Sequence, residues 1–403
     1  MYTRKPLGGL DTDMPRRALF LVPEAPYPAH GGGALRSASL LEYLARRYDL
    51  DVIVFHEPGA PDPVRSFPAG IAREIHVIEL ASHRRDILSR AARNAGRLAR
   101  GVPPLVDRFA GYSQSIGAFA HGRKYELAVI EHFWCAPYWE QLAPVSARTV
   151  LDLHNIESTL HARCAGVERG PQALAHGIFQ QAARELEKQW LPRYGCLLTA
   201  SEEDARIARA IAPKTQVTVY PNAIPLVPRP EARERDMLAF SGNLAYHPNI
   251  SAVRYFHNEI WPALRKRWPA LVWRLIGKNP HAVRNDTNGD GRIEVSGPVE
   301  NAIEELAAAK VVVVPLLAGS GTRFKVIEAW AAGRAVVSTT IGAEGLPARH
   351  GENILLADGP RPFADAVSLL LTAPALRAKL GETGRVLFES EFTWETAWRK
   401  LDL

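Results

Sequence analysis

Short apolar runs alternate with longer amphipathic stretches along most of the chain. From residue 17 onward, each run of mostly apolar residues, such as 311–315, is followed by a stretch with helical periodicity. Strands buried on both faces of a parallel sheet are typically continuous apolar runs, and successive parallel strands need a helical crossover. The pattern therefore predicts α/β architecture, with doubly wound sheets covered by helices on both faces.

The expected strands form two series with a proline-rich stretch between them. The first series is 18–22, 51–55, 74–79, 127–131, 149–153 and 196–200. The second is 237–241, 270–276, 292–296, 311–315, 335–338 and 354–357. The clearest helical patterns are 34–47, 175–194, 250–267 and 302–309. Clustered prolines between periodic regions indicate a linker. We expect a loose tail (1–16), an N-terminal domain (17–223), a linker (224–236), a C-terminal domain (237–390) and a C-terminal helix (391–403).

Composition narrows the class of protein. The 403 residues are 47% hydrophobic and 23% charged, as in ordinary globular proteins, and no apolar run approaches the roughly 18 residues that span a bilayer. The three cysteines are scattered, which suggests neither a disulfide framework nor a zinc site and favours a cytoplasmic protein. A formal charge of +6 fits an anionic partner, but no nucleic-acid-binding motif is present.

Residues 319–338 contain the largest group of candidate ligand-binding residues. The loop Gly319-Ser320-Gly321-Thr322-Arg323 follows an apolar strand and opens a helix that should start near Thr322. A helix start presents unpaired N–H groups, and glycines allow an anion to approach them. Lys325 adds a positive charge, and Glu328 could accept hydrogen bonds from ribose hydroxyls. This combination is suited to a sugar nucleotide.

The same segment resembles the donor-binding motif of the retaining glycosyltransferases of family 4, which have the GT-B fold. That motif has two glutamates eight positions apart; Glu328 matches the second, and Ser320 stands in place of the first. The resemblance implies two Rossmann-like domains facing each other across a cleft, with the donor on the second domain. It also implies retention at the anomeric carbon, no metal and no cofactor beyond the donor itself. We assign Lys325 and Glu328 to catalysis and the loop 319–323 to donor binding.

Two motifs of the first domain complete the expected site. Gly31-Gly32-Gly33 opens the first helix and is similar to the family's glycine-rich loop over the donor diphosphate; a plain flexible turn is the alternative. His154 follows the strand 149–153 and matches a histidine of the family's catalytic domain. We expect it to position the acceptor or contact the donor sugar. A structural histidine is the alternative, because such a role is common for an isolated His.

The turn after the first strand of the second domain carries Gly242 and Asn243. It resembles the family's glycine-containing donor-binding turn, although many members place an Arg and a Lys here. Asn243 and His247 are weaker substitutes, so Lys325 or Arg323 should carry more of the charge. A helix-capping turn is the alternative for this segment.

Two further segments have competing interpretations. Asp286, Asn288 and Asp290 match the first half of a calcium loop, but Gly297 occupies the position of the bidentate Glu, which favours a polar surface loop. The segment 83–100 predicts an amphipathic helix with an arginine face and a mostly small apolar face. Peripheral contact with the inner face of the membrane is one possibility, and a solvated helix packed on its own domain is favoured.

The leading functional hypothesis is a glycosyltransferase that moves a sugar from a nucleoside-diphosphate sugar to a glycan, lipid-linked or small-molecule acceptor. A GT-B sugar-nucleotide epimerase or phosphorylase is one alternative. A non-catalytic sugar-nucleotide-binding subunit is another, since Ser320 replaces a glutamate and the basic pair is missing. A dehydrogenase is disfavoured because no G-x-G-x-x-G follows the first strand.

Overall fold

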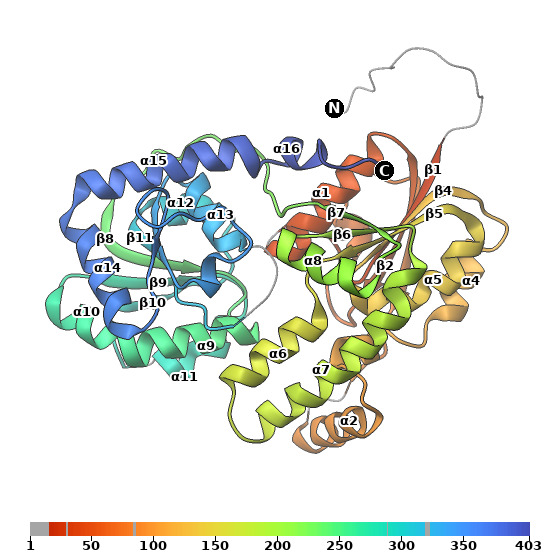
Figure 1. The fold of residues 1–403 in the computed structure, drawn as a ribbon, viewed down its shortest axis with the longest axis horizontal. Helices are drawn as coiled ribbons and strands as arrows, with labels where there is room; N and C mark the ends of the chain where they lie inside the picture. The colour runs from red at the N-terminus through yellow and green to blue at the C-terminus, as the bar shows by residue number, and fades with distance from the viewer. Residues whose placement is uncertain (1–15, 30, 84–85, 288, 319–322) are drawn as a thin grey trace, which may run out of the picture.

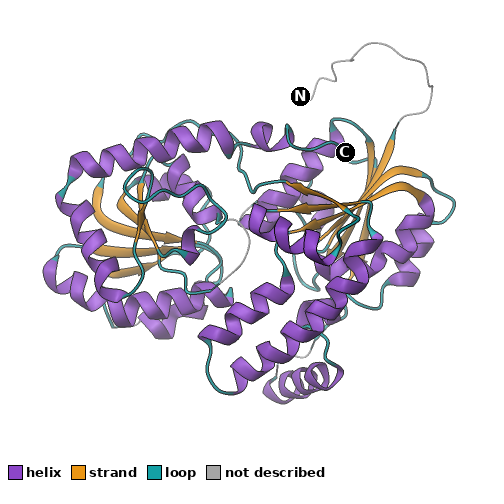
Figure 2. Ribbon diagram, in the orientation of Figure 1, coloured by secondary structure: helices purple, strands orange, loops and turns teal. Residues whose placement is uncertain are grey.

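The computed structural model describes residues 16–29, 31–83, 86–287, 289–318 and 323–403. These residues form two parallel sheets, each with helices on both faces, lying side by side (Figures 1 and 2). The predicted pair of doubly wound domains is confirmed. Among the described residues, none of the helices has both the length and the apolar composition that a bilayer crossing requires.

The first sheet has the strand order β3-β2-β1-β4-β5-β6-β7. Its strands are β1 (Arg17–Val22), β2 (Asp49–His56), β3 (Glu74–Glu79), β4 (Tyr125–Glu131), β5 (Ser146–Leu153), β6 (Cys196–Thr199) and β7 (Gln216–Val219). All pairings are parallel, and the order changes direction between β1 and β4. At such a switch point a crevice forms outside the carboxyl ends of the two neighbouring strands, and ligands of this kind of sheet bind there.

The second sheet repeats this arrangement in the order β10-β9-β8-β11-β12-β13. Its strands are β8 (Arg235–Ser241), β9 (Val272–Ile276), β10 (Ile293–Val295), β11 (Ala309–Val314), β12 (Ala335–Ser338) and β13 (Leu355–Leu356). The switch point lies between β8 and β11. The valines of β11 are fully buried, as expected for a central strand covered on both faces.

Helices connect the strands in both domains. Those of the first domain are α1 (Gly32–Ala45), α2 (Ile87–Arg100), α3 (Pro104–Arg108), α4 (Ser113–Ala120), α5 (Trp139–Leu142), α6 (Glu157–Val167), α7 (Pro171–Trp190) and α8 (Glu202–Ile211). Those that follow are α9 (His247–Tyr255), α10 (Trp261–Arg267), α11 (Arg284–Thr287), α12 (Ala302–Ala307), α13 (Phe324–Ala331), α14 (Pro360–Thr372), α15 (Pro374–Glu391) and α16 (Trp394–Trp398).

Several local expectations were wrong. The single helix expected at 250–267 is divided into α9, a π-helical turn at Phe256–Ile260 and α10. A proline in the first turn of α10 has no N–H to continue the α-helical pattern, which accounts for the break. The strand β7 was not expected. The segment 391–403 is not one helix, because α15 continues to Glu391 and α16 is a separate short element.

The segment after α15 returns to the first domain, as Figure 1 shows. Trp394, Trp398, Leu401 and Leu403 are buried in the core of the first domain, and Nε1 of Trp398 donates a hydrogen bond to the Ser39 carbonyl at 3.1 Å. At the crossing, Ile224 pairs with Thr393. Two segments of chain, one at the start of the expected linker and one after α15, therefore pass side by side between the domains.

Candidate active site

The starts of α1 and α13 meet where the two domains face each other. A Cβ atom added to Gly32 would overlap the ring of Phe324, so only glycine fits there without a shift of that ring. A Cβ atom at Gly33 would lie 4.0 Å from Nδ1 of His154. Because α1, α13 and His154 follow β1, β11 and β5, the structure brings together three predicted motifs at the carboxyl ends of strands.

The second-domain side consists of two glycine turns and a lysine. Gly242 and Gly277 follow β8 and β9 with φ angles of 142° and 146°, in the region that favours glycine. A Cβ at Gly277 would overlap the carbonyl of Gly242, and a Cβ at Gly242 would overlap Nζ of Lys325. The ammonium group therefore lies directly against the Gly242 turn, 5.1 Å from the ring centroid of Phe240.

Lys325 and Glu328 lie one turn apart on α13 and have opposite charges. Burial lowers the pKa of Lys325 to about 8, and the attraction of Glu328 only partly opposes this shift. Burial raises the pKa of Glu328, while a hydrogen bond from Ser241 Oγ to its Oε2 atom, 2.9 Å long, acts in the other direction. A bound polyanion would favour the charged form of Lys325.

On the first-domain side, His154 belongs to a buried network of charges. Its Nε2 atom lies 2.7 Å from Oε2 of Glu131 and 3.4 Å from Oδ2 of Asp152. Arg36 holds Asp152 through two hydrogen bonds of 2.7 and 2.5 Å. Ser37 Oγ donates to Glu131 Oε2 at 2.5 Å. Among the described residues no hydrogen bond to Nδ1 of His154 is found, and this atom faces Gly33.

This network shifts the pKa of His154. Burial acts to lower the pKa of His154, but Glu131 and Asp152 outweigh it and raise the pKa. Burial also favours the neutral form of Asp152, yet Arg36 and His154 hold its pKa well below the usual range. The imidazole is therefore held by two carboxylates, with one ring nitrogen directed toward the glycine loop.

The ring of His132 packs against His154, a contact that the sequence gave no reason to expect. Its ring stacks on His154 at 3.5 Å and on Trp134 at 4.1 Å between centroids. His132 has a φ of 62°, an uncommon conformation for a residue other than glycine. Burial lowers its pKa well below the usual range, so it is a neutral platform for His154. Glu131 and Asp152 were also missed, although a carboxylate ending an otherwise apolar strand was a usable signal.

Other predicted donor-binding residues have partners within the protein. Arg323 is buried, with Nε donating to the Ile341 carbonyl at 3.1 Å and its guanidinium 3.5 Å from Glu344. Asn243 Oδ1 accepts from the N–H of Ala245 at 3.1 Å, as a turn-capping side chain does. Their roles toward a donor stay predictions. The described part of helix α13 begins at Phe324, close to the expected start, and Gly319, Ser320, Gly321 and Thr322 lie outside the described residues.

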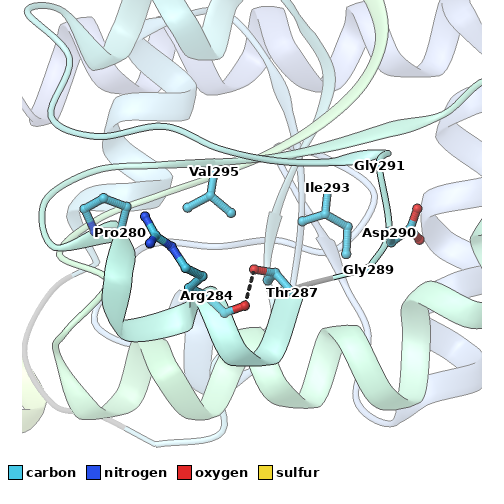
Figure 3. A pocket seen from close by; sticks show the side chains of 8 residues that line it. All are labelled: Pro280, Arg284, Thr287, Gly289, Asp290, Gly291, Ile293 and Val295. Carbon is cyan, nitrogen blue, oxygen red and sulfur yellow. Dashed lines mark hydrogen bonds between the residues drawn. The ribbon is translucent and has the colours of Figure 1, made fainter.

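A hollow of about 520 Å³ lies at the outer edge of the second sheet, along β10 (Figure 3). Pro280, Arg284, Thr287 and Asp290 are among its lining residues, and none of the predicted site residues that the structure describes is. Asp290 accepts from Nε1 of Trp261 at 2.8 Å and pairs with Arg265 at 3.2 Å. Its carboxylate is engaged in protein contacts, which favours a structural surface loop over a calcium site.

The helix α2 packs on its own domain with part of its arginine face turned inward. Arg97 is buried and pairs with Asp107 at 2.8 Å, and Arg100 pairs with the same carboxylate at 2.7 Å. The exposed side includes Leu88, Ala91 and Ala95. Membrane contact through 83–100 stays a prediction.

Two clusters of described residues have side chains close enough to hold a metal ion. One is Glu131, His132 and His154, and the other is Cys164, His176 and His247. In each cluster the ligand atoms lie within 4.8 Å of one another. In the first, Glu131 is already engaged by His154 and Ser37. His247, considered above as a donor ligand, is instead 2.8 Å from Glu168.

Comparisons with known proteins agree with this architecture. Residues 235–373 match the family described as "Glycosyl transferases group 1". A relative in Klebsiella pneumoniae, "Uncharacterized 44.6 kDa protein in cps region", is 19% identical over 355 residues, covering 85% of this chain and 87% of that protein.

Solved structures with the same fold cover nearly the whole chain. Sucrose-phosphate synthase from Thermosynechococcus elongatus has a TM-score of 0.72 at 18% identity, covering 95% of this chain and 96% of that one. Anabaena HepE in complex with UDP and glucose has a TM-score of 0.63 at 14% identity, with coverage of 95% and 97%. An S. aureus TarM mutant in complex with Fondaparinux, alpha-GlcNAc-glycerol and UDP has a TM-score of 0.66 at 11% identity, with coverage of 96% and 98%.

These findings establish the fold and support a class of protein. The two facing Rossmann-like domains constitute a GT-B fold. Together with the family match over 235–373, the fold supports a glycosyltransferase.

Proposed function

We propose that the protein transfers a glycosyl group from a UDP-sugar to the hydroxyl of a glycan or lipid-linked acceptor, with retention of the anomeric configuration and without a divalent cation. The observation that carries this proposal is the position of Lys325, against the Gly242 turn and one helical turn from Glu328. HepE and TarM have structures with UDP, which supports a uridine donor. Retention rests on the resemblance of 319–338 to the motif of retaining enzymes.

Lys325 and the start of α13 are the proposed diphosphate site. During transfer the bond between the anomeric carbon and the diphosphate oxygen breaks, and a bond to the acceptor oxygen forms while the acceptor proton is released. Negative charge builds on the leaving diphosphate. A lysine with a pKa of about 8 and the positive end of the α13 helix dipole would stabilise it. This arrangement is why no metal is proposed for the transfer step.

Glu328 is proposed to bind the donor ribose. Ser241 fixes one of its oxygens, so the carboxylate has a defined orientation. A carboxylate accepts two hydroxyl hydrogen bonds readily, and ribose offers two neighbouring hydroxyls. The pair formed by Lys325 and Glu328 would then contact the diphosphate and the ribose of a single donor.

His154 is proposed to orient the sugar relative to the acceptor. The carboxylates of Glu131 and Asp152 hold its ring, and Nδ1 faces Gly33 and the start of α1. Gly32 and Phe324 bring that loop against the second domain. A donor bound to α13 would therefore lie close to the imidazole.

The proposed acceptor class rests on two of the similar proteins. A relative is described as lying in a cps region, and TarM has a structure with a sugar-glycerol compound. Both favour a role in polysaccharide biosynthesis. The protein would then work as a cytoplasmic enzyme that meets a growing glycan, and peripheral contact through α2 would bring it to a lipid-linked one.

Ligand binding and turnover test the proposal together. We expect UDP at about 100 times its dissociation constant to stabilise the protein by about 2.7 kcal/mol in thermal unfolding, more than GDP, ADP or dTDP at the same concentration. Lys325→Met should abolish the shift. Lys310→Met is the matched control, since that lysine lies at the amino end of β11, opposite the carboxyl end that leads to the site, and pairs with Asp236.

The products distinguish the alternatives. With UDP-glucose and a glycan acceptor, NMR of the product should show the anomeric configuration of the donor. Inversion would contradict retention. Conversion of the sugar nucleotide without any acceptor would indicate an epimerase, and tight UDP binding with no turnover would indicate a binding subunit.

A further inference from the structure

Three side chains that can bind a metal ion through sulfur or nitrogen meet where the two domains come together, and none of them is among the proposed donor-binding residues. Cys164 lies on α6 and His176 on α7, both in the first domain, whereas His247 is the first residue of α9 in the second. One ligand atom from each lies within 4.8 Å of the other two. Cys164 is buried, and the segments converge from distant parts of the sequence.

Both histidines are held through one ring nitrogen. Nδ1 of His176 lies 3.0 Å from Nδ1 of His161, and Nε2 of His247 lies 2.8 Å from Oε1 of Glu168. Nδ1 of His247 is buried and has no hydrogen-bond partner among the described residues. Metal-binding histidines typically show this arrangement, in which a carboxylate or other partner fixes the far nitrogen while the near one binds the ion.

We propose that Cys164, His176 and His247 bind a zinc ion that links the α6–α7 pair of the first domain to the start of α9 in the second. Thiolate and imidazole are the ligands that zinc prefers, whereas magnesium and calcium require oxygen ligands. Three protein ligands leave a fourth position for water. Zn–S and Zn–N bonds of about 2.0–2.3 Å require the three side chains to draw together slightly from their present separation.

The ion would reinforce contacts that already cross between the domains at this place. Glu168 accepts from Ser251 Oγ at 3.4 Å, and Arg163 donates to Oε1 of Glu344 at 2.8 Å. Zinc coordination bonds would add to these contacts and, unlike an exposed ion pair, would not be weakened by salt. Since α9 follows the Gly242 turn, the ion would also fix the second-domain turn that contacts Lys325.

Zinc titration of the full-length protein tests this site without relying on activity. After removal of metal by a chelator, calorimetry with zinc alone should give one ion per chain. Cobalt should give the charge-transfer absorption of a thiolate ligand. Cys164→Ser and His247→Asn should each weaken zinc affinity by more than about 100-fold, beyond the 10–100-fold typical of outer-sphere partners. Cys196→Ser and His257→Asn are the matched controls and should retain zinc.

Each result decides the question. His247 is partly exposed, so His247→Asn reports on the site even if the buried Cys164→Ser variant fails to fold. Absence of zinc binding in the folded wild-type protein would overturn the proposal, as would unchanged affinity in both variants. Loss in Cys164→Ser with full retention in His247→Asn would overturn the link between the domains.

Discussion

Gly32 at the start of α1 packs directly against Phe324 at the start of α13, so the two domains touch through the first turns of two helices. Both helix starts carry partial positive charge. A ligand held here by both domains would therefore be expected to be anionic. Because of this contact, the size of the residue at position 32 in the first domain is limited by the Phe324 ring in the second domain.

That contact predicts different effects for neighbouring alanine substitutions. Gly32→Ala places a methyl group in the Phe324 ring and should lower turnover about tenfold or more, because small misplacements of reacting groups are costly. Gly33→Ala has ordinary space beside His154 and should cost much less. Steady-state kinetics on both variants measures the difference. Equal effects would show that the contact with Phe324 is unimportant for turnover.

Glu328→Gln should weaken donor binding while leaving the fold intact. The amide keeps the shape but loses the charge, and a charge-assisted hydrogen bond contributes about 1.5–3 kcal/mol, or roughly 10–100-fold in affinity. Calorimetry with UDP and its preferred sugar conjugate gives the value. Glu294→Gln, at a residue on the edge strand paired with Arg274, is the control. Unchanged affinity in folded Glu328→Gln would remove this residue from the ribose site.

Lys325 predicts opposite pH trends for binding and for stability. Its pKa of about 8 means that UDP affinity should fall as pH rises through 8, because the ammonium loses its charge. The unliganded protein should gain stability between pH 8 and 10.5, since the unfolded lysine still binds a proton in that range. Calorimetry and denaturant unfolding across this range test both trends. Lys325→Met should flatten both curves, and a wild-type affinity independent of pH would contradict the assignment.

The two roles open to His154 can be separated with a second substitution. His154→Ala leaves Glu131 without its partner at 2.7 Å, so both the melting temperature and turnover should fall. Adding Glu131→Gln removes the unpaired charge and should restore much of the melting temperature. If His154 orients the sugar, turnover stays low in the double variant. Recovery of both quantities together would mean that His154 only stabilises the first domain.

Transfer should not require a divalent cation. In Cys164→Ser, which lacks the proposed zinc site, excess EDTA should change kcat by less than about twofold, because Lys325 and the start of α13 supply the positive charge. This variant is used because EDTA would also remove zinc from the proposed site in the wild-type protein, and that loss could itself change kcat. Complete loss of transfer that Mg²⁺ or Mn²⁺ restores would overturn metal-independent transfer.

The strands were predictable because burial on both faces leaves a simple apolar signature. Runs such as 311–315 stand out for this reason, and twelve expected strands coincide with β1–β6 and β8–β13 within a few residues. The strand β7 is short and half-buried at the edge of its sheet, so Gln216–Val219 has no such signature. The break between α9 and α10 depends on local hydrogen bonding that helical periodicity does not reveal.

The grouping of the candidate residues was predictable where a motif is local in sequence. Gly242 and Lys325 lie close to strand–helix junctions and Glu328 lies one turn further along α13, and the structure places Lys325 against Gly242 and Glu328 against Ser241. Their roles toward a donor stay predictions. The partners of His154 depend on neighbouring strands: Glu131 ends β4 and Asp152 lies in β5, so their meeting requires the sheet order. Scattered cysteine spacing likewise gave no sign that Cys164 would meet two histidines, one of them from the other domain.

The return of the chain to the first domain has a consequence for biosynthesis. Trp394 and Trp398 fill the core beside Tyr43, but they are synthesised only after the entire second domain. During synthesis on the ribosome, the apolar surface of the first domain that Trp394 and Trp398 cover therefore stays exposed until the second domain has been made. Exposed apolar surface of this kind is prone to aggregation. The first domain is thus synthesised first but completed last. Any dependence on chaperones should be greatest between the synthesis of the first domain and the synthesis of α16.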